Sequence, residues 1–78
     1  MEAQRLPAID MVRTGENIKL LRESKHISVR ELQSIFSFST PQAIYKWQNG
    51  TCLPTLDNIA ALAFVFDVSI EDILVFLD

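Results

Sequence analysis

A run of polar side chains between Gln42 and Asn49 is the part of the sequence best equipped to bind another molecule. The apolar residues Ile44 and Trp47 have the spacing of a buried helix face, which turns the side chains between and around them outward. The residues expected on that outward face are Gln42, Ala43, Tyr45, Lys46 and Asn49. Amide, ammonium and phenol groups form hydrogen bonds with polar partners, so the chemistry indicated is recognition of a polar surface.

Residue sets that support catalysis are missing from the sequence. The chain has one histidine, His26, and one cysteine, Cys52, which stand 26 positions apart at the ends of different expected helices. They make no nucleophile–base pair, and no cysteine–histidine cluster has the spacing of metal ligands. No glycine-rich loop is present that would bind phosphate, and Glu71 and Asp72 suit the first turn of a helix. We expect no enzyme, no catalytic or metal-binding residue and no cofactor.

Length and composition limit the architecture that must position the outward face. A chain of 78 residues forms one small domain, and two glycines with three prolines are too few for a turn-rich β-sandwich or barrel. A single cysteine excludes an internal disulfide and fits a reducing compartment. No apolar run reaches the ~20 residues that span a bilayer, and the first residues carry no signal-peptide pattern. We therefore expect a cytoplasmic protein that makes no contact with a membrane.

Helix start and stop signals divide the chain into five segments. The first begins at Asp10 or Thr14, the second follows the capping box that starts at Ser28, and the third has Thr40 as its N-cap before Pro41. The expected helices are about 10–25, 29–36, 41–48, 56–66 and 70–77. This predicts an all-α fold of five short helices, with an N-terminal extension over residues 1–9 and one domain over residues 10–78.

Apolar residues at helical spacing predict which face of each segment is buried. In the first helix this face includes Ile18, Leu20 and Leu21, and Met11 and Val12 extend it; Gly15 is a tolerated weak point that costs ~1 kcal/mol. The buried residues expected further along are Val29, Leu32, Ile35, Phe36, Ile44, Trp47, Leu56, Ile59, Leu62, Ala63, Phe66 and Ile73. The apolar end 75–77 either closes this core or forms the seam between two copies.

Charge is distributed unevenly along the chain, whose net charge is −3. Residues 1–50 hold all seven basic residues and five acidic ones, which gives +2, whereas residues 51–78 hold five acidic residues and no basic one. Electrostatic fields are screened over ~8 Å at physiological salt, so an acidic half does not cancel a basic face. The pattern fits a surface for a polyanion, and it also fits an ordinary solvated surface.

The second and third segments form a helix pair joined by a turn of about four residues, which is the arrangement of a helix-turn-helix. The third helix of such a pair is narrow enough for the ~12 Å major groove, and the second lies across the phosphate backbone.

Six short stretches then follow one another in a recognisable order. They are NIKLLR at 17–22, ISVREL at 27–32, IYKWQNG at 44–50, LPTL at 53–56, AL at 61–62 and VSIEDIL at 68–74. Together they resemble the lambda-repressor-like helix-turn-helix family, also called the phage Cro-type or XRE family, from Thr14 to about Val75. The resemblance implies a DNA-binding domain whose helix-turn-helix is formed by the second and third helices.

The resemblance also suggests roles for the outward face of the third helix. Gln42 stands where members of the family read base edges, and a glutamine can form two hydrogen bonds with adenine. Lys46 is able to reach a guanine edge or a phosphate, and Tyr45 a phosphate or a thymine methyl group. A solvated amide, a solvated lysine and a partly packed tyrosine are the alternative readings of these three residues.

Contacts with the phosphate backbone are expected from residues around the two helices. Arg30 is the candidate on the second helix, and Thr40 stands at the start of the third. Asn49, Thr51 and the backbone amides around Gly50 correspond to a loop that holds a phosphate in relatives. Helix capping alone also accounts for Thr40 and for the Asn49–Gly50 turn.

Four positions depart from the usual family pattern. Gln33 replaces a small residue, Ser37 replaces a glycine at the start of the turn, and Val29 stands where a glutamine is frequent. Pro41 takes the place of a polar residue, and the turn is one residue longer than usual. These departures affect the transfer of base contacts more than they affect the fold.

The function expected is sequence-specific binding of double-stranded DNA by a small transcriptional regulator, acting as a homodimer because one domain makes few contacts. The alternative is a helix-turn-helix fold used as a protein-interaction module, such as an antitoxin-like or anti-regulatory partner. With no sensing domain in the sequence, regulation by a second protein is the more plausible control.

Overall fold

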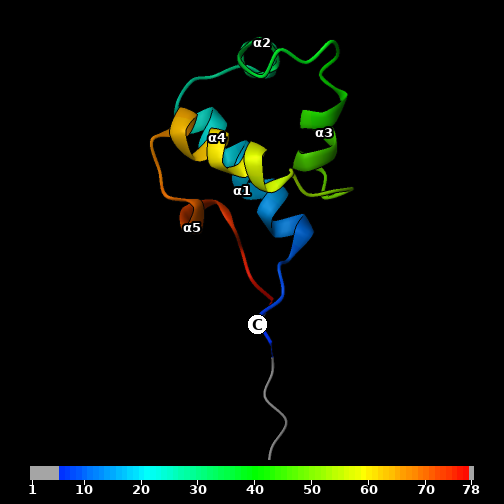
Figure 1. Cartoon of the computed structure of the whole chain (residues 1–78), viewed down its shortest axis with the longest axis vertical. Helices are drawn as coiled ribbons and strands as arrows, with labels where there is room; N and C mark the ends of the chain where they lie inside the picture. Colours follow the sequence, from blue (N-terminus) through cyan, green and yellow to red (C-terminus); the bar gives the residue numbers. More distant parts are fainter. Residues whose placement is uncertain (1–5, 78) are drawn as a thin grey trace, which may run out of the picture.

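The computed structural model describes residues 6–77, and over this range it contains five α-helices and no strand. The helices are α1 (Met11–Ser24), α2 (Val29–Ile35), α3 (Gln42–Gln48), α4 (Leu56–Phe66) and α5 (Ile70–Ile73). This confirms the predicted all-α architecture. In Figure 1, α2 and α3 lie in the upper part of the molecule, and the described segments that precede α1 and follow α5 lie in the lower part.

A single apolar core joins the helices. Every helix contributes to it, and its buried members are Ile18, Leu32, Ile44, Trp47, Leu62, Ala63, Phe66 and Ile73. Ile44 and Trp47 lie on the same face of α3, as their spacing predicted, so the opposite face of this helix is free for function. The core therefore fixes the orientation of α3.

Several apolar residues predicted to be buried are exposed instead. They are Met11, Val12, Leu20, Ile35 and Leu56. Leu20 is 63% exposed because the buried face of α1 runs through Ile18, and two positions along a helix turn a side chain about 160° away. Leu56 is 74% exposed at the first position of α4, one turn before the first buried residue of that helix, Ile59.

Helix caps account for most of the helix starts. Asp10 caps α1 by accepting a hydrogen bond from Arg13 N at 3.0 Å, which selects the earlier of the two predicted starts. Ser28 and Ser69 both form the predicted capping boxes. The predicted start of α3 was wrong by one residue. Pro41 is the N-cap in place of Thr40, and Gln42 is the first helical residue in place of Pro41.

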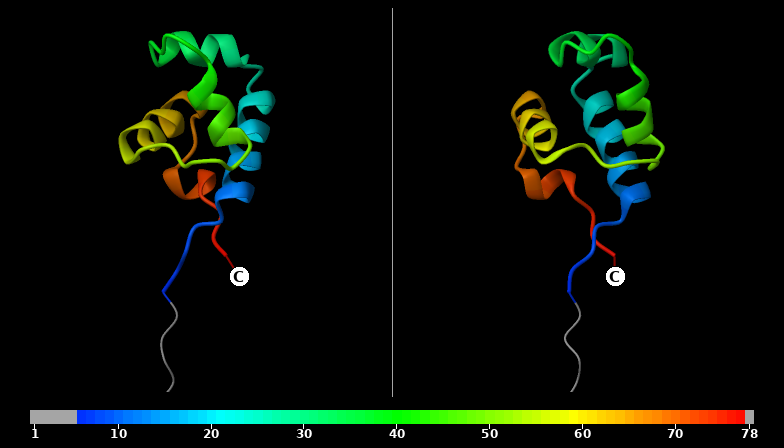
Figure 2. Two further views of the ribbon diagram at one scale, coloured as in Figure 1. Left: turned by 90° about the vertical axis from the view of Figure 1, so that its right-hand side faces the viewer. Right: turned by 45° about the vertical axis from the view of Figure 1, so that its right-hand side comes forward.

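The last helix is shorter than expected, and the chain after it is extended. Leu74 has a β conformation, so the prediction that Phe76 and Leu77 belong to a helix was wrong. Leu77 N donates to Ala8 O and Asp10 N donates to Val75 O, both at 2.8 Å, which places Ile9 opposite Phe76. Figures 1 and 2 show these two chain ends side by side.

Two polar side chains of α1, Thr14 and Asn17, hold the C-terminal part of the chain by hydrogen bonds. The Thr14 hydroxyl is fully buried, accepts a hydrogen bond from Val75 N at 2.9 Å and donates one to Val75 O at 3.3 Å. Asn17 Nδ2 donates to the carbonyl oxygens of Asp72 and Ile73 at 2.7 and 2.9 Å. Residues 8 and 9 of the expected extension thus contact the C-terminal segment, whereas residues 1–5 lie outside the described range.

Gly15 is not merely tolerated in α1, because the backbone of α3 lies directly against α1 at this glycine. A Cβ atom at this position would overlap the carbonyl oxygen of Trp47 and would lie 2.9 Å from that of Gln48. Both obstacles are backbone atoms, which cannot rotate away as a side chain can. The close crossing of the two helices therefore requires a residue without a side chain.

Candidate nucleic-acid interface

The helix pair α2–α3 has the predicted order, but its connection is longer than the four residues expected. Six residues, 36–41, separate the two helices. Ser37 has φ 55°, a left-handed conformation that glycine adopts more easily than serine. The backbone thus keeps the turn that a glycine would favour, and Ser37 adopts it at a cost of about 1–2 kcal/mol.

The extra length of the turn is packed rather than loose. The ring of Phe38 stacks on Phe36 with centroids 5.3 Å apart, and both rings form T-shaped contacts with Trp47. Gln33 Nε2 donates a hydrogen bond to Phe38 O at 3.2 Å. Gln33 therefore stabilises the longer turn through this hydrogen bond.

The outer face of α3 brings together the side chains predicted to read bases. Gln42, Tyr45, Lys46 and Asn49 are exposed at positions i, i+3, i+4 and i+7, which form one stripe on a helix. Tyr45 is 49% exposed, which fits the partly packed alternative as well as a contact residue. The stripe presents two amides, a phenol and an ammonium group.

In the loop after α3, the exposed side chains are available to bind a ligand, whereas the backbone amides already donate hydrogen bonds within the turn. Asn49 N, Gly50 N and Thr51 N donate to the carbonyl oxygens of Tyr45, Trp47 and Lys46. The prediction that amides around Gly50 hold a phosphate was therefore wrong, because these donors are already used within the turn. The side chains of Asn49 and Thr51 are both exposed.

Arg30 and Thr40 lie close to this face. Both are exposed, and Arg30 lines a groove together with Tyr45. Thr40 Oγ1 accepts a hydrogen bond from Gln42 N at 3.5 Å, which leaves its own proton available for another acceptor.

Two grooves flank Tyr45 on the α2–α3 side of the molecule. The larger, of about 640 Å³, lies between α2 and the start of α3, and the smaller, of about 400 Å³, lies between α1 and α3. Val29 and Tyr45 line both grooves. The remaining lining residues are Arg30, Gln33, Ser34, Phe38 and Pro41 in the larger groove, and Lys19, Arg22, Gln48 and Asn49 in the smaller.

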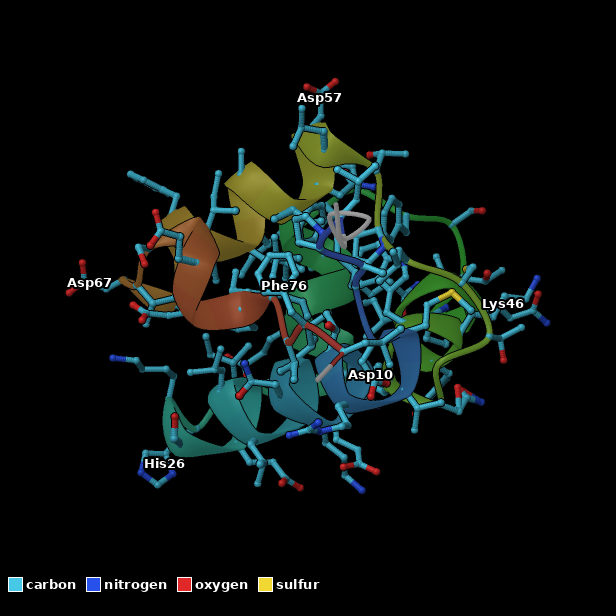
Figure 3. The ribbon with its side chains drawn as sticks, turned by 90° about the horizontal axis from the view of Figure 1, so that it is seen from below. Asp10, His26, Lys46, Asp57, Asp67 and Phe76 are labelled. Carbon is cyan, nitrogen blue, oxygen red and sulfur yellow. The ribbon has the colours of Figure 1, made fainter. Side chains whose placement is uncertain are left out.

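The charge of the residues that line these grooves is opposite in sign to the net charge of the whole chain. Together they are lined by three cationic residues and by no aspartate or glutamate, although the net charge of the chain is −3. Arg22 donates from Nε to Gln48 Oε1 at 2.8 Å and from Nη1 to Ile27 O at 2.9 Å, and both acceptors are neutral. In Figure 3, Lys46 and the acidic Asp67 project from opposite sides of the molecule.

Sequence reasoning missed Lys19, Arg22 and Gln48 as members of this surface. Lys19 and Arg22 are three positions apart in α1, so their spacing alone placed them on one helix face. Their position beside α3 depends on the close helix crossing at Gly15, which periodicity does not reveal.

Metal-ligand clusters and membrane-spanning helices are both absent from the part of the chain that the structure describes. From residue 6 to residue 77, no three side chains of metal-ligand type lie together. No helix within that range is long and apolar enough to cross a membrane.

Comparison with known proteins identifies the family. The model of the Cro/C1-type HTH DNA-binding domain matches residues 17–78, well over half of the chain and including α2, α3 and the turn between them. A search of curated proteins and a search of solved structures each found no match. The chain thus belongs to the family of Cro/C1-type HTH DNA-binding domains.

Proposed function

We propose that this protein is a small transcriptional regulator that binds double-stranded DNA sequence-specifically through the α2–α3 face. The observation that carries the proposal is the charge of the two grooves, which hold three cationic residues and no carboxylate in a chain of net charge −3. A phosphate backbone is the partner that such a local excess of positive charge favours.

In this proposal α3 enters the major groove with its exposed stripe toward the bases. Gln42 at the first turn forms two hydrogen bonds with an adenine, and Lys46 one turn later contacts a guanine. Exposure of both side chains on the face opposite Ile44 and Trp47 supports these roles. Tyr45 lies between them on the stripe and contacts a phosphate or a thymine methyl group.

Contacts with the phosphate backbone flank the stripe in the proposed complex. Arg30 on α2 and Lys19 on α1 stand at the two grooves on either side of Tyr45 and bind phosphates as cations. Thr40, Asn49 and Thr51 add hydrogen bonds from their exposed side chains. Arg22 is held by Gln48 and Ile27, so it acts chiefly by positioning α3 and by its charge.

The proposed regulator acts as a homodimer, with the seam at the exposed end of the C-terminal segment. Phe76 and Leu77 are both exposed and lie beside residues 8 and 9 at the end of the molecule opposite α2 and α3. Burial of these side chains between two copies would add the affinity that one small domain lacks.

Selection of bound sequences from a random duplex pool at low salt tests the proposal. The wild type is compared with Gln42→Ala/Lys46→Ala and with Lys25→Ala, a matched exposed control that lines neither groove. We expect a palindromic motif from the wild type and from Lys25→Ala, and loss of that motif in the double variant.

Each other outcome removes a specific part of the proposal. A single asymmetric half-site retains DNA binding and contradicts the dimer. An unchanged motif in the double variant contradicts base reading by Gln42 and Lys46. No enrichment by the folded wild type contradicts DNA binding altogether.

A second candidate function, a protein-interaction module, is favoured by the outer face of α4. Leu56, Ala60 and Phe64 are exposed at intervals of four positions, which places them on one side of the helix, and Phe64 is 88% exposed. A regulatory protein that binds this stripe would be compatible with DNA binding by α3. Failure to enrich any duplex, together with retention of a partner that Phe64→Ser loses, would favour this candidate.

A further inference from the structure

The larger groove beside Tyr45 has two chemically different walls. One wall comes from α2 and is polar, with Arg30, Gln33 and Ser34 at positions i, i+3 and i+4 of that helix. The other wall is formed by Phe38, Pro41 and Tyr45, from the turn and from α3, and it is mainly apolar. Val29, at the first position of α2, completes the lining.

Contacts within the protein fix the position of Phe38 in the apolar wall. Phe38 lies in a cluster with Phe36 and Trp47, with its ring centroid 5.3 and 5.8 Å from theirs. Gln33 donates to Phe38 O, so the hydrogen bond that secures the wall comes from the opposite side of the same groove. These contacts exist within the protein alone, so Phe38 is positioned in the groove wall before a ligand enters.

We propose that this groove binds the C5-methyl group of a thymine, an inference that rests on the DNA binding proposed above. In the major groove only thymine among the four bases presents a methyl group, and its O4 acceptor lies beside that methyl. The methyl group would contact Val29, Pro41 and the ring of Tyr45. The Ser34 hydroxyl, a donor on the α2 wall, lies across the groove from that apolar surface, and Arg30 on the same wall remains the phosphate contact proposed above.

Two further observations favour a DNA base as the occupant. The groove adjoins the exposed stripe of α3, since Tyr45 belongs to both. Its charged lining residue is a cation, Arg30, and no carboxylate lines it, which suits the approach of a polyanion. Val29, which has no hydrogen-bonding group, then has a role in recognition through apolar contact.

The test uses the duplex selected from the random pool, with each thymine replaced in turn by deoxyuridine, which lacks the methyl group. Affinities are measured by fluorescence anisotropy for the wild type, Val29→Thr and Tyr45→Ser. Ile35→Ser is the control, because Ile35 is exposed on α2 and lines neither groove. Val29→Thr keeps the shape of the side chain, and Tyr45→Ser changes a half-exposed residue, so both variants are expected to fold.

We expect the wild type and Ile35→Ser to lose about fourfold in affinity at one or more thymines, the fold-change that corresponds to ~0.8 kcal/mol for one buried methyl group. Val29→Thr and Tyr45→Ser should bind thymine and deoxyuridine duplexes with affinities within about twofold of each other.

Three outcomes would overturn the inference while DNA binding stands. They are a selected motif without thymine, wild-type binding that is insensitive to every replacement, and a methyl effect that both groove variants retain. Failure of the wild type to bind any duplex would instead remove the proposed function, and the inference with it.

Discussion

Replacement of Gly15 by alanine tests the helix crossing that positions α3. Alanine is the better helix former by ~1 kcal/mol, so secondary-structure propensity alone predicts a more stable protein. In the structure, the added methyl group overlaps Trp47 O and lies 2.9 Å from Gln48 O. Both obstacles are backbone, so α1 and α3 must separate for the methyl group to fit.

The magnitude follows from the two opposing effects. Overpacking of a tight contact costs about 1–3 kcal/mol, and overlap with a carbonyl oxygen places Gly15→Ala near the upper limit. After subtraction of the gain in helix propensity, the free energy of unfolding should fall by ~2 kcal/mol. For a domain of this size that loss lowers Tm by roughly 8–16 °C.

Urea-induced unfolding followed by circular dichroism measures this change, and thermal unfolding gives Tm independently. Glu16→Ala is the control, because Glu16 is the exposed neighbour in the same helix and its replacement should alter stability by no more than ~0.5 kcal/mol. A Gly15→Ala variant as stable as the wild type, or more stable, would refute the close approach of α1 and α3.

Three further changes test other contacts by the same unfolding assay. Thr14→Val preserves the shape of a fully buried side chain but removes its two hydrogen bonds with Val75, and should cost ~2 kcal/mol; an unchanged urea midpoint would argue against the pairing of the chain ends. Ser37→Gly relieves a φ of 55° and should raise stability by ~0.5–1 kcal/mol after allowance for the greater freedom of the unfolded chain; a loss of stability would mean that the Ser37 side chain makes a contribution of its own. Arg22→Lys keeps the charge but cannot reproduce the hydrogen bonds to Gln48 and Ile27, and should cost ~1 kcal/mol; equal stability would indicate that only the charge of Arg22 matters.

The features that sequence predicted correctly depend on neighbouring residues. The capping boxes at Ser28 and Ser69 each require only two side chains three positions apart, and both form. The outer stripe of α3 follows from Ile44 and Trp47, because two large apolar residues fix the rotation of a short helix. These local patterns were sufficient for the five-helix fold and for the exposed stripe of α3.

The features that sequence missed depend on partners far along the chain. The extended end after Ile73 is held by Asp10 and Thr14, the latter 61 positions before its partner Val75. Lys19 joins the grooved surface only because Gly15 allows α1 to lie against α3. The amides around Gly50 were misassigned because local spacing does not show which donors the turn already uses.

The salt dependence of duplex binding tests most directly whether the α2–α3 face binds DNA. The affinity of the selected duplex is measured over a range of salt concentrations for the wild type, Arg30→Gln and Lys25→Gln. Each variant loses one positive charge, but only Arg30 lines a groove beside Tyr45. We predict that Arg30→Gln lowers the log–log slope by about one unit, whereas Lys25→Gln leaves it unchanged. Equal slopes for the wild type and Arg30→Gln, or a loss confined to Lys25→Gln, would contradict DNA binding through this face.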